Sequence, residues 1–107
     1  MRVIAKSTLS EFWQLYPDSE KCLKSWFIEA SRATWKNPGE IKTQYRSASI
    51  LKRGRVVFNI AGNKYRLLVE VLYKQQIIYV KFVGTHAQYD AIDVEDYNGE
   101  QIQGHKD

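Results

Sequence analysis

The first third of the chain carries apolar residues at the spacing of amphipathic α-helices. Ser7 is placed to cap a first helix that Pro17 ends. Its apolar positions are Leu9, Phe12, Trp13 and Tyr16. The same spacing predicts a second helix from Asp18 or Ser19 to about Thr34. Its apolar positions are Leu23, Trp26, Phe27 and Ala30. We expect the aromatic residues of both helices to pack in the core.

Residues 40–46 are predicted to form a short turn or helix, and from about residue 50 the pattern becomes typical of β-strands. "ILKRGRVVFNI" predicts one strand, or two shorter strands kinked at Gly54. "YRLLVEVLY" and "IIYVKFVG" predict two more. Gly62 and Asn63 tolerate positive φ and therefore favour a tight hairpin between the first two runs. The simplest topology is an antiparallel meander of three strands.

Both faces of the middle strand are apolar, so both need cover. We expect the helices to cover one face, and either a partner or the C-terminal segment to cover part of the other. Thr85 is placed to cap a short last helix in "THAQYDAID". The prediction is an α+β domain over residues 1–96, with N-terminal helices packed on a small antiparallel sheet. Residues 97–107 are expected to form a mobile acidic tail.

Length and composition agree with one globular domain. The chain has 107 residues, of which 44% are hydrophobic and 26% charged. Its single cysteine, Cys22, has no partner for an internal disulfide, and no signal peptide precedes the domain. No apolar run approaches the roughly 20 residues of a membrane helix. We therefore expect a cytoplasmic protein without a membrane partner.

The charge distribution changes this picture more than the net charge of +4 does. Residues 32–81 contain eleven basic side chains against the two acids Glu40 and Glu70, whereas residues 82–107 contain six acids against Lys106. A cationic middle favours a polyanion such as RNA, because neutralised phosphates release counterions. A solvated basic face without a partner is the alternative.

Several chemistries can be set aside from the residue types. One cysteine and two histidines make no zinc motif, no spaced acids suggest calcium, and no glycine loop has the spacing of a phosphate-binding fingerprint. We expect no metal and no cofactor. Glu70 is isolated among the strands, so paired catalytic carboxylates are improbable. We expect Glu70 to form a salt bridge with Arg66 instead.

The remaining chemistry lies in a cationic set close to one histidine and one tyrosine. The set consists of Lys52, Arg53, Arg55, Lys64, Arg66, Lys81, His86 and Tyr89. In an antiparallel meander, the start of the middle strand lies beside the end of the last strand, so Arg66 approaches His86. Fixed positive charge beside a group that titrates near neutral pH suits the cleavage of an RNA phosphodiester. Taken singly, each residue also has a plain structural reading, such as the protection of an edge strand by Lys52, Arg53 and Arg55.

The stretch "VFNIAGNKYRLLVEVLY", followed by "IIYVKFVGTHAQYD", resembles the motif of the HigB toxins, a branch of the RelE-like messenger-RNA interferases. The family motif has a Phe-Asn strand end, a Gly-Asn turn, an Arg-Leu strand and a Thr-His-x-x-Tyr-Asp ending. Its residues fall here on Asn59, Gly62, Asn63, Arg66, Thr85, His86, Tyr89 and Asp90. The resemblance covers most of the chain up to Asp90.

The resemblance implies a RelE-like fold, metal-independent cleavage of messenger RNA on the ribosome and neutralisation by a helix-turn-helix antitoxin called HigA, with a toxin–antitoxin heterotetramer among the expected assemblies. It implies catalytic roles for Arg66 at the phosphate, His86 as general acid or base, and Tyr89 in base stacking or proton handling. Lys52, Arg53, Arg55, Lys64 and Lys81 are the expected RNA-backbone contacts. Two alternatives stay open: a noncatalytic RNA- or ribosome-binding module, and a structural protein that docks an acidic partner.

Overall fold

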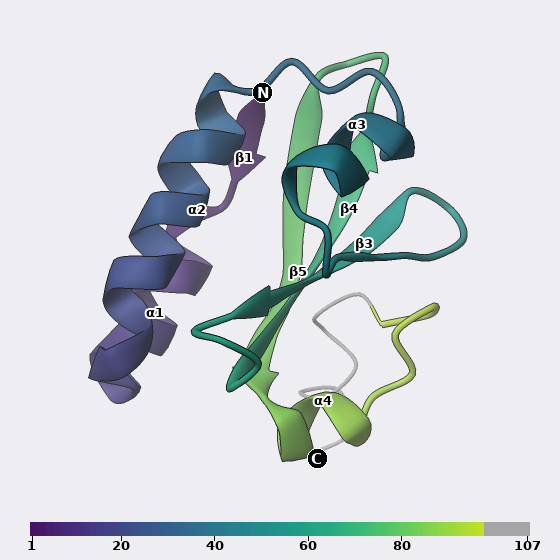
Figure 1. Cartoon of the computed structure of the whole chain (residues 1–107). Helices are drawn as coiled ribbons and strands as arrows, with labels where there is room; N and C mark the ends of the chain where they lie inside the picture. The colour runs from purple at the N-terminus through teal and green to yellow at the C-terminus, as the bar shows by residue number, and fades with distance from the viewer. Residues whose placement is uncertain (98–107) are drawn as a thin grey trace.

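The computed structural model describes residues 1–97 as three layers, with helices on one face of a sheet and the C-terminal segment on the other (Figure 1). In chain order the elements are β1 (Arg2–Ile4), α1 (Lys6–Leu15), the 3₁₀ helix η1 (Pro17–Ser19), α2 (Glu20–Arg32), α3 (Pro38–Gln44), β2 (Ser49–Ile50), β3 (Arg55–Ile60), β4 (Tyr65–Leu72), β5 (Ile77–Thr85) and α4 (His86–Asp90). The predicted α+β class is confirmed. Over these residues, no helix is both long and apolar enough to cross a bilayer.

The sheet has five strands in the order β1-β5-β4-β3-β2. The meander β3-β4-β5 is antiparallel, as predicted. The sheet as a whole is mixed, because β1 pairs in parallel with Ile77–Tyr79 of β5, and in this respect the expectation of a purely antiparallel sheet is wrong. A strand of three residues has no measurable period, and its partner lies far away in the sequence.

The two predicted N-terminal helices are present, with α2 one or two residues shorter than predicted at each end and with a different cap on α1. α1 begins at Lys6 with Ala5 at its N-cap position, so the assignment of Ser7 as the cap is wrong and Ser7 lies within the first turn. β1 ends at Ile4 and the chain enters α1 at Lys6, before it reaches Ser7.

α3 confirms the predicted short helix and is capped by Asn37, whose side chain accepts a hydrogen bond from the Glu40 amide.

The main core lies between the helices and the inner face of the sheet. The alternation of β4 turns Tyr65, Leu67 and Val69 toward this side, where each is buried. Aromatic side chains join the layers: Trp26 of α2 packs edge-on against Phe58 of β3, with 5.4 Å between ring centroids. The prediction that the helix aromatics form core is confirmed.

Positive-φ residues make the tight turns on either side of β3. Gly54 has a φ of 74° in the turn after β2, and this turn splits the predicted run into two strands. Gly62 and Asn63 have φ values of 60° and 88° and form the predicted hairpin between β3 and β4. That hairpin sets the register in which Asn59 lies opposite Arg66.

The outer face of the sheet carries a second, smaller apolar cluster. It is built from buried Val57, Leu68 and Tyr97, with Phe82, Tyr89, Ile92 and Val94 packed against them. The chain after α4 therefore covers part of this face, which was one of the two predicted covers. Tyr97 is 7% exposed, so the predicted mobile tail does not begin at this residue. The other residues of that tail lie outside the described part of the chain.

Candidate functional site

One row of cross-strand neighbours on the outer face brings together the start of β4 and the end of β5. Arg66 lies opposite Asn59 of β3 on one side and opposite Gly84 of β5 on the other. A Cβ atom at Gly84 would lie 2.5 Å from Phe82 Cζ and 2.7 Å from Gln88 Oε1. The absence of a side chain at Gly84 therefore leaves room for Phe82 and for Gln88 of α4 to pack beside β4, the strand that carries Arg66.

A capping box at the start of α4 holds the motif residues that follow. The Thr85 hydroxyl accepts the Gln88 amide at 3.2 Å, and the Thr85 amide donates to Gln88 Oε1 at 2.9 Å. The predicted cap is confirmed. His86 is the first residue of the helix and is exposed to solvent, whereas Tyr89 is half-buried. Because Tyr65 pairs with Thr85, the sheet register places His86 one residue beyond that pair and two residues beyond Gly84 of the Arg66 row.

Arg66 is held on two sides. Its Nη1 donates to the Asn63 carbonyl at 3.3 Å, and its guanidinium carbon lies 5.9 Å from the centre of the Tyr89 ring. Burial raises the pKa of the Tyr89 hydroxyl above its usual 10.0, and the nearby Arg66 charge only partly opposes this effect. The Tyr89 hydroxyl therefore keeps its proton at neutral pH and can act as a hydrogen-bond donor.

The expected salt bridge between Arg66 and Glu70 is absent from the described residues. Glu70 Oε1 instead lies 3.8 Å from Arg55 Nη2 and 3.8 Å from Lys81 Nζ. Four residues along a strand span about 13 Å, whereas a cross-strand neighbour is about 5 Å away. Arg55 is the cross-strand partner of Glu70, so the register decides this pairing and leaves the Arg66 guanidinium at the site.

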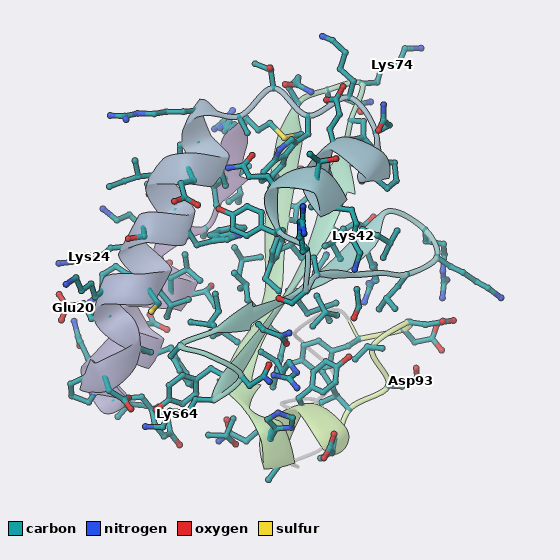
Figure 2. The ribbon with its side chains drawn as sticks, viewed as in Figure 1. Glu20, Lys24, Lys42, Lys64, Lys74 and Asp93 are labelled. Carbon is teal, nitrogen blue, oxygen red and sulfur yellow. The ribbon has the colours of Figure 1, made fainter. Side chains whose placement is uncertain are left out.

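Lys64, which was predicted to share the RNA surface, is turned toward the helix layer. Its ammonium group donates to Asp18 Oδ2, and Asp18 Oδ1 also accepts the Tyr65 hydroxyl at 2.5 Å. Figure 2 shows Lys64 beside the helices and Asp93 on the opposite side of the sheet. The hydrogen bond from Lys64 lowers the pKa of Asp18, with a smaller contribution from Tyr65.

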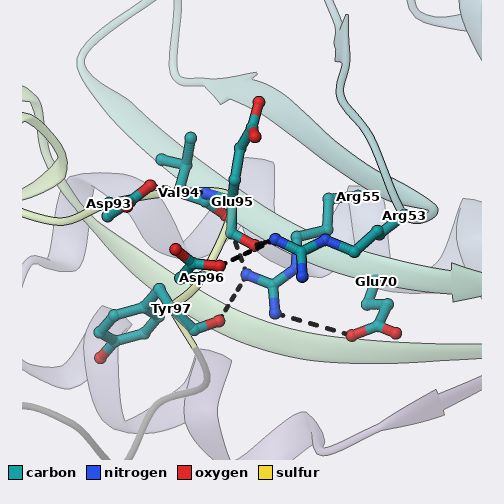
Figure 3. Close-up of polar contacts among 8 residues, drawn as sticks. All are labelled: Arg53, Arg55, Glu70, Asp93, Val94, Glu95, Asp96 and Tyr97. Atoms are coloured by element: carbon teal, nitrogen blue, oxygen red, sulfur yellow. Dashed lines mark hydrogen bonds and ion pairs between the residues drawn. The ribbon is translucent and has the colours of Figure 1, made fainter.

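Of the other predicted backbone contacts, Lys52, Arg53 and Arg55 lie at the opposite end of the outer face from Arg66, and Lys81 lies between the two ends. Lys52 and Arg53 are exposed, Lys81 is half-buried, and Arg55 is only 7% exposed. Arg55 Nη1 donates to the carbonyls of Val94 at 2.8 Å and Tyr97 at 2.5 Å (Figure 3). These hydrogen bonds hold the Arg55 guanidinium inside the domain, so Arg55 is not part of the solvent-exposed surface that Lys52 and Arg53 form.

Two acidic residues bind cations of the predicted set and were not themselves predicted to take part. Asp18 holds Lys64 and Tyr65, and Asp96 Oδ1 accepts Arg53 Nη2 at 2.8 Å. No local sequence signal marks either contact, because the partners are more than 40 positions apart. The Thr85 and Gln88 pair, by contrast, has the spacing of a capping box and was readable from the sequence. Residues 1–97 contain no group of three or more His, Cys, Asp or Glu side chains placed to hold a metal ion.

Comparisons with known proteins show the family to which this chain belongs. Residues 19–92 match the family model HigB_toxin, described as the RelE-like toxic component of a toxin–antitoxin system. The mRNA interferase toxin HigB of Escherichia coli (strain K12) is 27% identical over 92 residues, which are 84% of this chain and 88% of that protein. The mRNA interferase HigB of Escherichia coli O6:H1 is 24% identical over 94 residues, covering 86% and 91%. The matched region contains β3, β4, β5 and α4, and therefore the whole Arg66 site.

Proposed function

Because the chain belongs to the HigB family of RelE-like toxins, we propose that it is the toxin of a type II toxin–antitoxin system and an endoribonuclease that cleaves messenger RNA. The relatives that carry the name mRNA interferase align with 84% of its length, which supports this activity. We propose that it acts in the cytoplasm, where messenger RNA is translated.

The observation that carries the proposal is the position of Arg66 on β4, opposite Gly84 of β5 and close to the Tyr89 ring of α4. The Arg66 guanidinium carbon lies 5.9 Å from the centre of the Tyr89 ring. His86 is exposed at the start of α4, the helix that carries Tyr89. A planar guanidinium can give two hydrogen bonds to two phosphate oxygens. The exposed His86 imidazole on α4 is a side chain of the type that serves as a general acid or base. These are the groups that an in-line attack on a phosphodiester requires.

In the proposed reaction the 2′-hydroxyl of the nucleotide attacks the adjacent phosphorus while a general base takes its proton. The bond from phosphorus to the 5′ oxygen breaks, and a general acid gives that oxygen a proton. The products are a 2′,3′-cyclic phosphate and a 5′-hydroxyl end. Arg66 stabilises the negative charge that gathers on the phosphate oxygens, and His86 carries one of the two proton transfers. Tyr89, which keeps its proton, supports a stacked base or donates a hydrogen bond.

Positive residues outside this row are proposed to hold the RNA backbone. Lys52 and Arg53 are exposed near the β2–β3 turn, and Lys81 lies between them and the Arg66 row along the outer face. The ribosome presents the messenger RNA in the proposed reaction. A HigA-like helix-turn-helix antitoxin neutralises the toxin, within a toxin–antitoxin heterotetramer.

The test is inducible expression of the protein in a bacterial host, with growth followed and new 5′-hydroxyl ends mapped on messenger RNA. Wild-type protein is expected to arrest growth and to cut within reading frames. Arg66→Ala and His86→Ala are each expected to abolish the cuts. Lys74→Ala is the matched control, since it removes one exposed positive charge at the turn before β5, far from α4 (Figure 2). Intact messages with a folded wild-type protein, or cuts that survive in both site variants, would exclude the proposed site.

A further inference from the structure

The segment of residues 93–97, here named the C-terminal strap, is bonded to Arg53 of the β2–β3 turn and to Arg55, the first residue of β3. Arg53 Nη2 donates to the Glu95 carbonyl at 2.7 Å and to Asp96 Oδ1 at 2.8 Å (Figure 3). Arg55 binds the Val94 and Tyr97 carbonyls. The strap is internally closed by its own turn, because the Tyr97 amide donates to the Asp93 carbonyl at 2.8 Å.

The strap lies across the middle of the outer face. The Tyr97 ring packs edge-on against Phe82 with 5.5 Å between centroids, and Phe82 lies opposite Leu68 in the sheet. This apolar row separates the Arg66 row at one end of β4 from Glu70 and Arg55 at the other. A strand of RNA held by Arg66 at one end and by Arg53 at the other would therefore cross the strap.

The contacts of the strap differ in strength along its length. Arg55 is buried and its bonds are part of the core of this face. Arg53 and Asp96 are exposed, with 64% and 61% of their side chains accessible. An exposed ion pair of this kind is weak and exchanges with other ions. A phosphate can replace the carboxylate on the Arg53 guanidinium, because both groups present it with a similar pair of oxygens.

We propose that the Asp96 carboxylate occupies the place of an RNA phosphate on Arg53, so that the C-terminal strap and RNA compete for this end of the outer face. The inference rests on the proposed function, since it concerns the path of the RNA that Arg66 cleaves. The strap is then an internal inhibitor: RNA binding displaces Asp96, while the Arg55 bonds and Tyr97 keep the segment attached to the domain.

The test measures the affinity of the full-length protein for a labelled single-stranded RNA of about 20 nucleotides at low and moderate salt. All variants carry His86→Ala, so that the RNA stays intact. Asp96→Asn is expected to bind RNA about two- to five-fold more tightly, the size of an exposed ion pair. Glu95→Gln is the matched control: it removes one negative charge from the same segment, but only its backbone carbonyl contacts Arg53. It is expected to change the affinity less.

Two further measurements separate competition from a general charge effect. In an Arg53→Ala background, Asp96→Asn should give no gain, because the shared site is gone. Hydrogen exchange should show faster exchange of the Asp96 amide, but not of the Tyr97 amide, when wild-type protein is saturated with RNA. Equal affinity of Asp96→Asn and Glu95→Gln, or a gain that persists without Arg53, overturns the proposal. Absence of RNA binding in every variant overturns it too, and the mapped 5′-hydroxyl ends then decide separately whether the interferase proposal survives.

Discussion

The guanidinium of Arg66 and the ring of Tyr89 lie 5.9 Å apart although the two residues belong to different elements, β4 and α4. The contact exists because Arg66 pairs with Gly84, and because Thr85 then starts α4 at once. The strand pairing and the helix cap together convert a linear motif into a site. The side chains that carry the proposed chemistry depend on both.

Arg66→Ala is expected to lower the rate of messenger-RNA cleavage by about 10²- to 10³-fold, the loss typical of one electrostatic donor to a transition state. Arg66→Lys should recover only a small part of this loss, because an ammonium group lacks the planar fork that meets two phosphate oxygens. Cleavage of a programmed ribosome complex, measured under single-turnover conditions, checks the prediction. Equal rates for Arg66→Lys and wild type would show that charge alone is required.

Gly84→Ala is expected to destabilise the domain by about 1–3 kcal/mol, because the added methyl group overpacks the contact between β5 and α4. Its new Cβ would meet Phe82 Cζ at 2.5 Å and Gln88 Oε1 at 2.7 Å. Gly62→Ala is the comparison: no atom lies within 4 Å of its Cβ, and its cost comes only from the φ of +60°. Urea unfolding measures both. Gly84→Ala should also lower the cleavage rate by more than the loss of folded protein explains, because α4 carries His86 and Tyr89.

The Asp18 pair with Lys64 makes a pH-dependent contribution to stability. The folded-state pKa of Asp18 is lowered from 3.8, mainly by the hydrogen bond from Lys64. The unfolded state therefore binds the proton more readily, so the contribution is present above pH 3.8 and is lost as the pH falls through the lower folded pKa. Asp18→Asn should lower the Tm at neutral pH, and the difference from wild type should disappear in strong acid.

Lys64→Gln provides the control for that experiment, because it removes the other half of the pair. If the pair is the cause, the double variant Asp18→Asn with Lys64→Gln should lose less than the sum of the two single changes. Additive losses at neutral pH would instead assign the effect of Asp18 to its hydrogen bond with Tyr65, which accounts for the smaller part of the pKa shift.

Arg55 and Arg53 are two residues apart, but truncation of Arg55 is expected to cost much more stability than truncation of Arg53. Arg55→Ala should cost about 2–3 kcal/mol, because it deletes bonds from a buried charged group to Val94 and Tyr97. Arg53→Ala removes an exposed guanidinium and should change the free energy of unfolding by less than about 0.5 kcal/mol. Denaturant unfolding of both variants checks the contrast. Similar losses would mean that the strap is held equally by the two arginines.

Local patterns in the sequence predicted most of the elements. Helical spacing places α1 and α2, Gly62 and Asn63 favour the β3–β4 hairpin, and Thr85 marks the start of α4. These signals act over a few residues, where backbone dihedral preferences and periodic burial decide the structure. The approach of Arg66 to the His86 end of β5 also followed, because an antiparallel meander permits few registers.

Only the tertiary structure decided which charges are neutralised. Glu70 contacts Arg55 and Lys81 instead of Arg66, Lys64 binds Asp18, and Arg53 binds Asp96. The short β1 and the docking of Tyr97 on the outer face depend on the same kind of contact. Long charged side chains pair with whichever element lies beside them in space, and sequence spacing does not record that neighbour. The positive residues were therefore visible in the sequence, whereas the fold determined which of them remain available to RNA.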